Sequence, residues 1–264
     1  MIVFLHIPKT AGSTFQFILE NTFGIFACHT DHNKRPRFGQ DDYDFMRRFF
    51  PRLRSLAGHN MIDPLSLRIP GAFYMTFLRN PVARVFSHYQ DAVQHGNLRL
   101  GFEETLRQKG ILENLHVKRM TGDRDLDRAK SFLEKCSFVG LTEKFELSLH
   151  LLERISPYRL NLNYKRQRVA RDNRIRQALE ADSRVVDKTL EYNRLDLALY
   201  EFVQREIFPK LCAQARVNPA DPVGSHDRYR TEIKWNYLLG HLYNMSFYRQ
   251  ICKLRNRLAA RAAA

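Results

Sequence analysis

The chain has 264 residues, of which 44% are hydrophobic, so it can bury a sizeable core and is not disordered throughout. The 43 Lys and Arg residues outnumber the 28 Asp and Glu residues, which gives a net charge of +15. This surplus attracts polyanions such as nucleic acid, acidic membranes, nucleotide cofactors and acidic glycans, without choosing among them.

Strands and helices are predicted to alternate along the chain. Short apolar runs predict buried strands, and apolar residues three or four positions apart predict helices. We expect strands at 2–6, 25–29, 55–59, 72–78 and 138–141. We expect helices at 13–23, 41–50, 81–94, 102–109, 126–136, 143–155, 173–182, 184–208 and 246–258. The alternation predicts an α/β fold in which helices flank a central parallel sheet.

The loop after the first predicted strand has the composition of an anion site. Its sequence, IPKTAGST, leads directly into a helix, whose first N–H groups are unpaired and attract anions. The lysine precedes the glycine and no first glycine is present, which departs from the P-loop order and argues against a kinase or NTPase. Ser13 or Thr14 is the expected N-cap of the helix. The expected phosphate ligands are Lys9, Thr10, Ala11, Gly12, Ser13 and Thr14.

A second cluster of candidate anion ligands follows the predicted strand 72–78, in the segment FLRNPVARVFSHY. Arg79 stands at the carboxyl end of this strand, where doubly wound sheets bind ligands. Ser87 lies about two helical turns into the next helix, and an arginine with a hydroxyl suits a phosphate monoester. Two such clusters predict one cofactor that carries two phosphate groups.

These two segments resemble the cofactor-binding motifs of carbohydrate sulfotransferases that use 3′-phosphoadenosine 5′-phosphosulfate (PAPS). The closest resemblance is to the group of heparan sulfate 2-O-sulfotransferase and its bacterial relatives. IPKTAGST resembles the 5′-phosphosulfate loop of the family, and its 3′-phosphate pattern R-[ND]-P-x-x-R-x-x-S-x-Y is matched by Arg79, Asn80, Pro81, Arg84, Ser87 and Tyr89.

The resemblance spans about residues 2–210 and implies a three-layer, P-loop-like sulfotransferase fold. It implies PAPS as the sulfuryl donor and its desulfated form, PAP, as the product. No metal is expected, because a sulfuryl group carries less charge than a phosphoryl group. Lys9 is expected to stabilise the charge that develops on the leaving phosphate.

The resemblance also implies a catalytic histidine in a Gly-His context, which His59 matches in the segment SLAGHNMID. An imidazole can take the proton of an acceptor hydroxyl near neutral pH. Several other groups stay open: His88 as a rival base, Asp63 as an orienting group or base, His29 and His32 as substrate contacts, and His6 as a structural residue.

The predictions for the remainder of the chain depend on features that are less specific than the two motifs above. The segment FVGLTEKFELSLHLLE matches a further strand–turn–helix of the family, and the basic loop 161–174 after it is expected to close over the nucleotide with Lys165, Arg166 and Arg168. We expect a sulfotransferase domain at 1–215 and an aromatic, basic helical extension at 216–264 packed on the same domain. Glycan binding and contact with a membrane surface stay open for this extension.

The expected acceptor is a carbohydrate, and the basic surface favours an acidic glycan. No nucleic-acid-binding module is recognisable, so no specific nucleic-acid partner is expected. The alternatives are another nucleotide-dependent transferase or kinase, and a non-catalytic polyanion-binding protein.

Four scattered cysteines without a C-x-x-C pair predict free, mostly buried thiols in a reducing compartment. We see no signal peptide and no apolar run of about 18 residues, so we expect a soluble, cytoplasmic protein without a transmembrane segment. A peripheral association with a membrane, and an origin as the soluble fragment of a Golgi-anchored parent, stay open.

Overall fold

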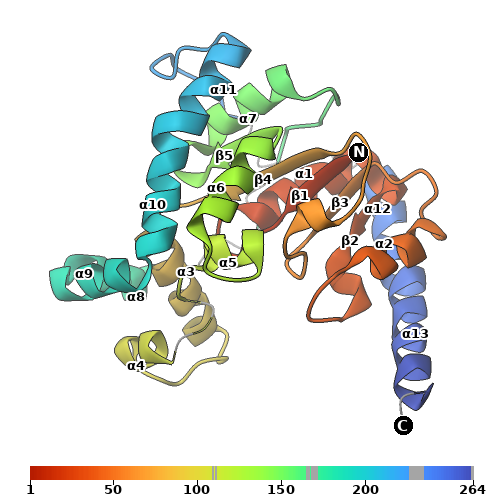
Figure 1. Ribbon diagram of the computed structural model, residues 1–264, viewed down its shortest axis with the longest axis horizontal. Coiled ribbons are helices and arrows are strands. Elements are labelled where there is room, and N and C mark those ends of the chain that lie inside the picture. Colours follow the sequence, from red (N-terminus) through yellow and green to blue (C-terminus); the bar gives the residue numbers. More distant parts are fainter. Residues whose placement is uncertain (109, 111, 165–166, 168–171, 226–234, 263–264) are drawn as a thin grey trace.

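The computed structural model describes residues 1–108, 110, 112–164, 167, 172–225 and 235–262 (Figure 1). At its centre is a five-stranded sheet, ordered β2-β3-β1-β4-β5, in which every pairing is parallel. The strands are β1 Ile2–Leu5, β2 Ala27–His29, β3 Ser55–Gly58, β4 Phe73–Leu78 and β5 Phe138–Leu141. All five strands lie within or at the predicted ranges.

The helices that surround the sheet follow the predicted order along the chain, and the short helices α5 and α12 lie in segments without a predicted element. Their bounds are α1 Gly12–Phe23, α2 Gln40–Arg47, α3 Pro81–Gln94, α4 Phe102–Arg107, α5 Leu115–Thr121, α6 Leu126–Lys135, α7 Phe145–Ile155, α8 Arg174–Ala181, α9 Ser183–Tyr192, α10 Arg194–Phe202, α11 Phe208–Ala215, α12 Trp235–Leu242 and α13 Arg249–Ala262.

Different helices bury the two faces of the sheet. Successive residues of a strand point to opposite faces. Phe4 of β1 packs edge-on against Phe15 of α1, at a ring-centroid distance of 4.9 Å. Its neighbour Val3 belongs to a separate core with Met46 of α2 and Tyr248 from the C-terminal region. Burial on both faces explains why β1 is a continuous apolar run, and it confirms the predicted α/β fold with helices flanking a parallel sheet.

The central strand β1 lies between β3 and β4. Leu5, its last residue, pairs with Gly58 of β3 and with Thr76 of β4. The loops that leave these three parallel strands therefore start side by side at one edge of the sheet. This is the edge at which open α/β sheets bind their ligands.

Two predicted helices have different limits in the structure. The helix expected at 184–208 is interrupted at Asn193, which lies between α9 and α10. The side chain of Asn193 accepts a hydrogen bond from the N–H of Asn114. A π-helical turn at Val203–Ile207 then separates α10 from α11. The helix expected at 246–258 is longer, because α12, a π-helical turn at Tyr243–Tyr248 and α13 follow one another without a break. Figure 1 shows them as one rod, which we call the C-terminal rod.

The C-terminal rod packs on the sheet and its flanking helices, which we call the sheet unit. Gly240 of α12 lies so close to the 3₁₀ turn Gly24–Phe26 that an added Cβ would come within 2.4 Å of the Gly24 carbonyl carbon. Asn244 donates to the Ala27 carbonyl, and Arg255 of α13 pairs with Asp42 of α2 at 2.8 Å.

The division of the chain at residue 215 stays a prediction. In the described part of the chain, no helix is long and apolar enough to cross a membrane.

Candidate active site

A cavity of about 790 Å³ lies at the carboxyl edge of the sheet. Residues that follow four of the strands line this cavity: Lys9 after β1, His59 after β3, Arg79 after β4 and Glu143 after β5. Small-molecule sites commonly measure about 300–1,000 Å³, so the cavity is large enough for a nucleotide. The parallel register of the sheet therefore gathers residues that are up to 134 positions apart in the chain.

The loop between β1 and α1 turns through two left-handed residues. Lys9 and Ala11 have φ values of 69° and 62°, a conformation that costs a non-glycine residue about 1–2 kcal/mol. Ala11 is the N-cap of α1 and makes no side-chain cap, so the predicted capping by Ser13 or Thr14 is wrong: the helix begins earlier, at Gly12. The N–H groups of Gly12 and Ser13 precede the first intrahelical bonds, and both residues line the cavity.

The three hydroxyls of this loop have different surroundings. Ser13 and Thr14 line the cavity, as the phosphate-site prediction requires. Thr10 is fully buried, and its hydroxyl donates to the Ile7 carbonyl at 2.9 Å, so its side chain closes the loop rather than facing the cavity. The structure thus corrects the expected role of the Thr10 hydroxyl.

Gly12 is needed for packing. A Cβ at this position would lie 1.9 Å from Cδ2 of His6, which is itself only 2% exposed. The His6 ring in turn contacts the His59 ring, with the two centroids 3.8 Å apart. His6, expected to be a structural residue, therefore lines the cavity and supports the candidate base. The glycine in the loop makes room for this support, a reason that the sequence did not reveal.

Two long-range contacts hold His59 in position. Its backbone N–H donates to Asp31 at 3.0 Å, and the N–H of Asn60 donates to the same carboxylate at 3.1 Å. Its ring Nδ1 lies 3.0 Å from the His6 carbonyl oxygen. A carbonyl can only accept, so Nδ1 carries the proton and Nε2 keeps a lone pair. His59 is therefore held in the tautomer that a base needs.

The surroundings also keep His59 neutral. Burial lowers the pKa of His59 below its ordinary value, and the positive charge of Arg119 acts in the same direction. The carboxylate of Asp31 and the bond to the His6 carbonyl oppose this effect in part. An imidazole with a lowered pKa is unprotonated at neutral pH and able to accept a proton.

The second cluster of candidate anion ligands lies against the first. The guanidinium of Arg79 donates through Nη1 to the Lys9 carbonyl at 3.2 Å, which joins the loops after β4 and β1. Asn80 caps α3 by accepting from the N–H groups of Val82 and Ala83, with Pro81 at the first helical position. This start directs α3 so that Ser87 lines the cavity with Arg79. The two anion clusters predicted from sequence thus face one shared space.

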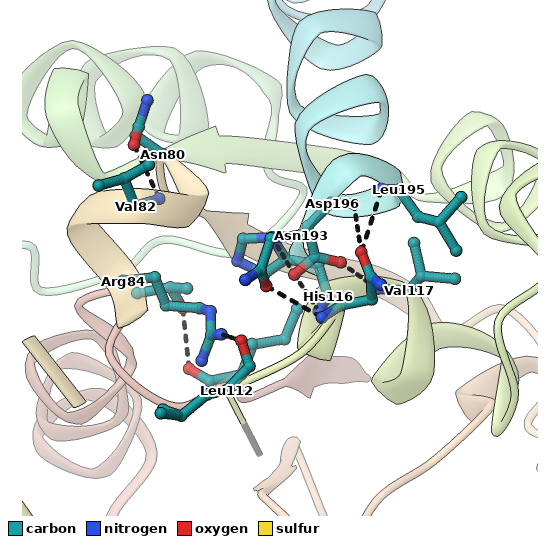
Figure 2. A network of polar contacts seen from close by, with 12 residues as sticks. Asn80, Val82, Arg84, Leu112, His116, Val117, Asn193, Leu195 and Asp196 are labelled. Atoms are coloured by element: carbon teal, nitrogen blue, oxygen red, sulfur yellow. Dashed lines mark hydrogen bonds and ion pairs between the residues drawn. The ribbon is translucent and has the colours of Figure 1, made fainter. Parts of the chain in front are cut away.

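Two other residues of the matched pattern point away from the cavity. Arg84 is fully buried and donates to the Leu112 carbonyl at 3.0 Å. Figure 2 shows it beside the network in which Asp196 accepts from the N–H groups of His116 and Val117. Burial lowers the pKa of Arg84 to about 10. Arg84 therefore ties α3 to the segment before α5, and Tyr89 likewise serves packing, because its hydroxyl donates to the Leu100 carbonyl.

Lys9 forms an ion pair within the protein. Its ammonium lies 2.9 Å from Asp91 Oδ1 on α3, one turn beyond Ser87. Burial alone would raise the pKa of Asp91, but the hydrogen bond and charge of Lys9 outweigh it and lower the pKa. His88 lies beside this pair, and burial, then the charges of Arg84 and Lys9, lower its pKa to about 4. His59 and His88, two of the histidines that line the cavity, are thus neutral at neutral pH.

The other lining carboxylates have partners of their own. Glu143 accepts from the N–H of Asn80 and from the hydroxyl of Tyr200, both at 2.9 Å. Glu146 accepts from the hydroxyl of Tyr164 at 2.7 Å. Each of these two carboxylates thus already accepts hydrogen bonds within the protein.

The basic loop 161–174 reaches the cavity at the positions that can be described. Tyr164 and Gln167 line it, and the N–H of Gln167 donates to the Thr14 hydroxyl at 3.2 Å. The predicted ligands Lys165, Arg166 and Arg168 lie outside the described residues. Part of the remaining wall comes from beyond residue 215, from Pro219, Asp221 and Val223.

The remaining candidates lie elsewhere. His29 and His32 line a second, smaller cavity of about 190 Å³ between α1 and α12. Asp63 does not line the main cavity and pairs with Arg128 at 3.7 Å. The carboxylate that supports His59 is Asp31, which sequence reasoning missed because it is contributed by another loop. Asp91 had a detectable signal, since it lies four residues after Ser87 on one helical face.

Comparisons with known proteins identify the family. Residues 1–203 match a model of the sulfotransferase family. No curated protein matches the chain. Among solved structures, the chain is similar to a crystal structure of a sulfotransferase from Alicyclobacillus acidocaldarius, with 18% identity over 75% of this chain and 98% of that chain, at a TM-score of 0.41. Because the family match covers more than half of its length, the chain belongs to the sulfotransferase family.

Proposed function

We propose that the chain transfers a sulfuryl group from PAPS to a hydroxyl of a carbohydrate, with His59 as the base, as a relative of the heparan sulfate 2-O-sulfotransferase group. The observation that carries the proposal is the shared cavity. It brings the start of α1, Lys9, Arg79 and Ser87 together with an imidazole whose Nε2 keeps a lone pair.

The donors of the cavity fit a nucleotide with two phosphate groups. The N–H groups at the start of α1, the Lys9 ammonium and the Ser13 hydroxyl suit the 5′-phosphosulfate. Arg79 and Ser87, on the next strand–helix junction, suit the 3′-phosphate. The Arg79 bond to the Lys9 carbonyl keeps these two sets adjacent, which is what one adenosine between them requires.

PAPS supplies the activated sulfuryl group when bound. Lys9 then exchanges its partner Asp91 for the phosphate and stabilises the charge on the leaving oxygen. His59 accepts the proton of the acceptor hydroxyl at Nε2. The imidazolium that results is stabilised by Asp31, whose charge acts to raise the pKa of His59. The net charge of +15 favours an acidic glycan as the acceptor.

Calorimetry with PAP and ADP tests the proposal. We expect PAP to bind one site per chain, with ADP at least about tenfold weaker because it lacks the 3′-phosphate that Arg79 and Ser87 would hold. Lys9→Met should weaken PAP binding, whereas Lys135→Met, an exposed lysine at the end of α6, should not.

A screen of glycans with labelled PAPS then identifies the acceptor. Transfer of label to a carbohydrate by the wild-type chain, and its loss in Lys9→Met, is the expected result. Equal affinity for ADP and PAP would favour another nucleotide-dependent transferase or a kinase. Steeply salt-dependent polyanion binding without any PAP binding would favour a non-catalytic polyanion-binding protein.

A further inference from the structure

The C-terminal rod leaves a row of large apolar side chains uncovered. Trp235 is 80% exposed, and Leu238, Leu239 and Leu242 are exposed by 42% to 59%. Their spacing of three, four and seven residues places them on one face of α12. Isolated exposed leucines are ordinary, but a continuous row of this kind marks an interaction surface.

The row continues along the rod and beside it. Phe247, Leu254 and Leu258 are 47%, 57% and 56% exposed. Ile25 and Phe26, in the 3₁₀ turn on which α12 packs, are also exposed. We call these nine residues, Ile25, Phe26, Trp235, Leu238, Leu239, Leu242, Phe247, Leu254 and Leu258, the apolar row.

The rod residues of the apolar row lie on a different side of the rod from its attachment to the sheet unit. The rod is attached through Gly240 against Gly24, through Asn244 on the Ala27 carbonyl, and through Arg255 on Asp42. Gly240, Asn244, Tyr248 and Cys252 are buried. The uncovered side chains are therefore not a loose part of the core, because the core-facing positions of the rod are already filled.

The charge of the rod is of one sign. Residues 235–264 contain five Lys and Arg residues and no Asp or Glu. Three of them, Lys253, Arg257 and Arg261, are exposed and follow one another at four-residue intervals, so they form a stripe along α13 next to Leu254 and Leu258. An uncovered apolar row next to a cationic stripe, with tryptophan and leucine in the row, is the composition of a helix that lies in a membrane interface.

We propose that the C-terminal rod docks this sulfotransferase on the surface of an anionic lipid bilayer. The apolar row inserts among the headgroups and upper acyl chains, and the stripe of Lys253, Arg257 and Arg261 contacts lipid phosphates. A second copy of the chain would bring the same positive stripe and the same net charge of +15, which opposes self-association through this face. Nucleic acid would match the charge but would leave the leucines of the row in water.

The only tryptophan of the chain lies in the apolar row, so its fluorescence reports on the row alone. The probe is vesicles of phosphatidylglycerol mixed with phosphatidylcholine, compared with vesicles of phosphatidylcholine alone. We expect a blue shift of the Trp235 emission and co-sedimentation with the anionic vesicles, both weakened by added salt. Binding of equal strength to both kinds of vesicle, or no binding, would overturn the proposal.

Variants separate the two parts of the surface. Leu239→Glu with Leu242→Glu should abolish co-sedimentation, because two charges would enter the interface. The triple change Lys253→Gln, Arg257→Gln and Arg261→Gln should weaken partitioning on the order of 100-fold. The matched control is Leu100→Glu, an exposed leucine away from the rod, which should bind as the wild type does. Unchanged binding by the double glutamate variant would refute the role of the row.

Two further measurements separate membrane docking from self-association and from cofactor binding. A blue shift without vesicles, together with a doubled mass in light scattering, would show that a second copy covers the row, and would overturn the proposal. Lys9→Met should bind vesicles as the wild type does, so this variant tests membrane docking separately from PAPS binding. Thermal unfolding of each variant shows whether it is folded.

Discussion

At the scale of single residues, the position of the candidate base depends on a stack of neighbours. Gly12 leaves room for the His6 ring, the ring and carbonyl of His6 hold the His59 ring, and Asp31 holds the His59 backbone. The contacts of His59 with His6 and with Asp31 join segments that are distant in the chain. The reactivity proposed for His59 is therefore sensitive to substitutions that do not touch His59 itself.

Replacing the base should separate chemistry from binding. We expect His59→Asn to lower turnover by about 10²–10⁴-fold, the usual contribution of a general base, while calorimetry gives an unchanged affinity for PAP. His88→Asn is the control, because His88 also lines the cavity but its Nδ1 has no hydrogen-bond partner among the described residues. A larger loss of turnover in His88→Asn than in His59→Asn would assign the base to His88.

The pH dependence of turnover should reflect the lowered pKa of His59. A base acts when it is unprotonated, so activity falls as the pH falls through its pKa. Since burial lowers the pKa of His59, the acid limb should lie below pH 6.5, the ordinary value for histidine. Asp31→Asn removes a charge that raises this pKa and should move the limb to still lower pH. A limb above pH 7 in the wild type would contradict the assignment.

The packing of Gly12 against His6 predicts that a larger residue at position 12 displaces the His59 ring. In Gly12→Ala the added Cβ must displace His6, with a loss of about 1–3 kcal/mol of unfolding free energy, typical of overpacking. Turnover should fall more than PAP affinity, because His59 moves with His6. Gly101→Ala, where a Cβ meets nothing within 4 Å, is the matched control. A variant with wild-type turnover would show that the stack does not position the base.

At the scale of elements, α3 divides its side chains between the cavity and the protein interior. Ser87, His88 and Asp91 line the cavity, whereas Arg84 points into the protein toward Leu112 and the start of α10. The strand before α3 ends in Arg79, which reaches across to the loop after β1. One motif thus carries two arginines with different functions.

The two arginines allow a matched comparison. Arg79→Met should reduce PAP affinity at least about tenfold in calorimetry, with a small change in thermal stability. Arg84→Met should leave the Leu112 carbonyl without its donor and lower the unfolding free energy by about 1–3 kcal/mol, with a smaller effect on PAP affinity. The reverse pattern, with Arg84 governing affinity and Arg79 governing stability, would contradict the roles proposed for the two arginines.

At the scale of the whole molecule, three histidines make the fold sensitive to acid. Burial lowers the pKa of His116 and of His88 to about 4, and burial with the neighbouring His29 lowers the pKa of His32 to about 3. In the unfolded chain each would titrate near 6.5. Below that pH the unfolded state binds more protons than the folded state, so stability falls as the pH decreases.

Thermal unfolding across pH checks this expectation. The stabilisation from the three histidines is complete above about pH 6.5 and is lost progressively toward pH 4 and below, so the melting temperature should fall over this range. His88→Gln should make the fall less steep, because one group no longer takes up a proton on unfolding. A melting temperature that stays constant from pH 7 to pH 4 would contradict the lowered pKa values.

Some residues that line the cavity could be predicted from the sequence because their signal is local. Lys9, Gly12 and Arg79 each stand in a short strand–loop–helix segment, and the residues that define such a junction are adjacent in the chain. Their placement around one cavity follows from the parallel order of β1, β3 and β4. Motif matching alone was less reliable inside the segments, where Thr10, Arg84 and Tyr89 serve packing.

The sequence by itself determined the five strands, most of the helices, their alternation and the two strand–helix junctions whose residues line the cavity, because apolar periodicity and helix starts are encoded within a few neighbouring residues. Only the tertiary structure decided that Asp31 and His6 hold His59, that Asp91 pairs with Lys9, and that the rod presents its apolar row outward. These are contacts between distant segments. They depend on the strand register and on which helix faces pack against other elements, and no short stretch of sequence determines either.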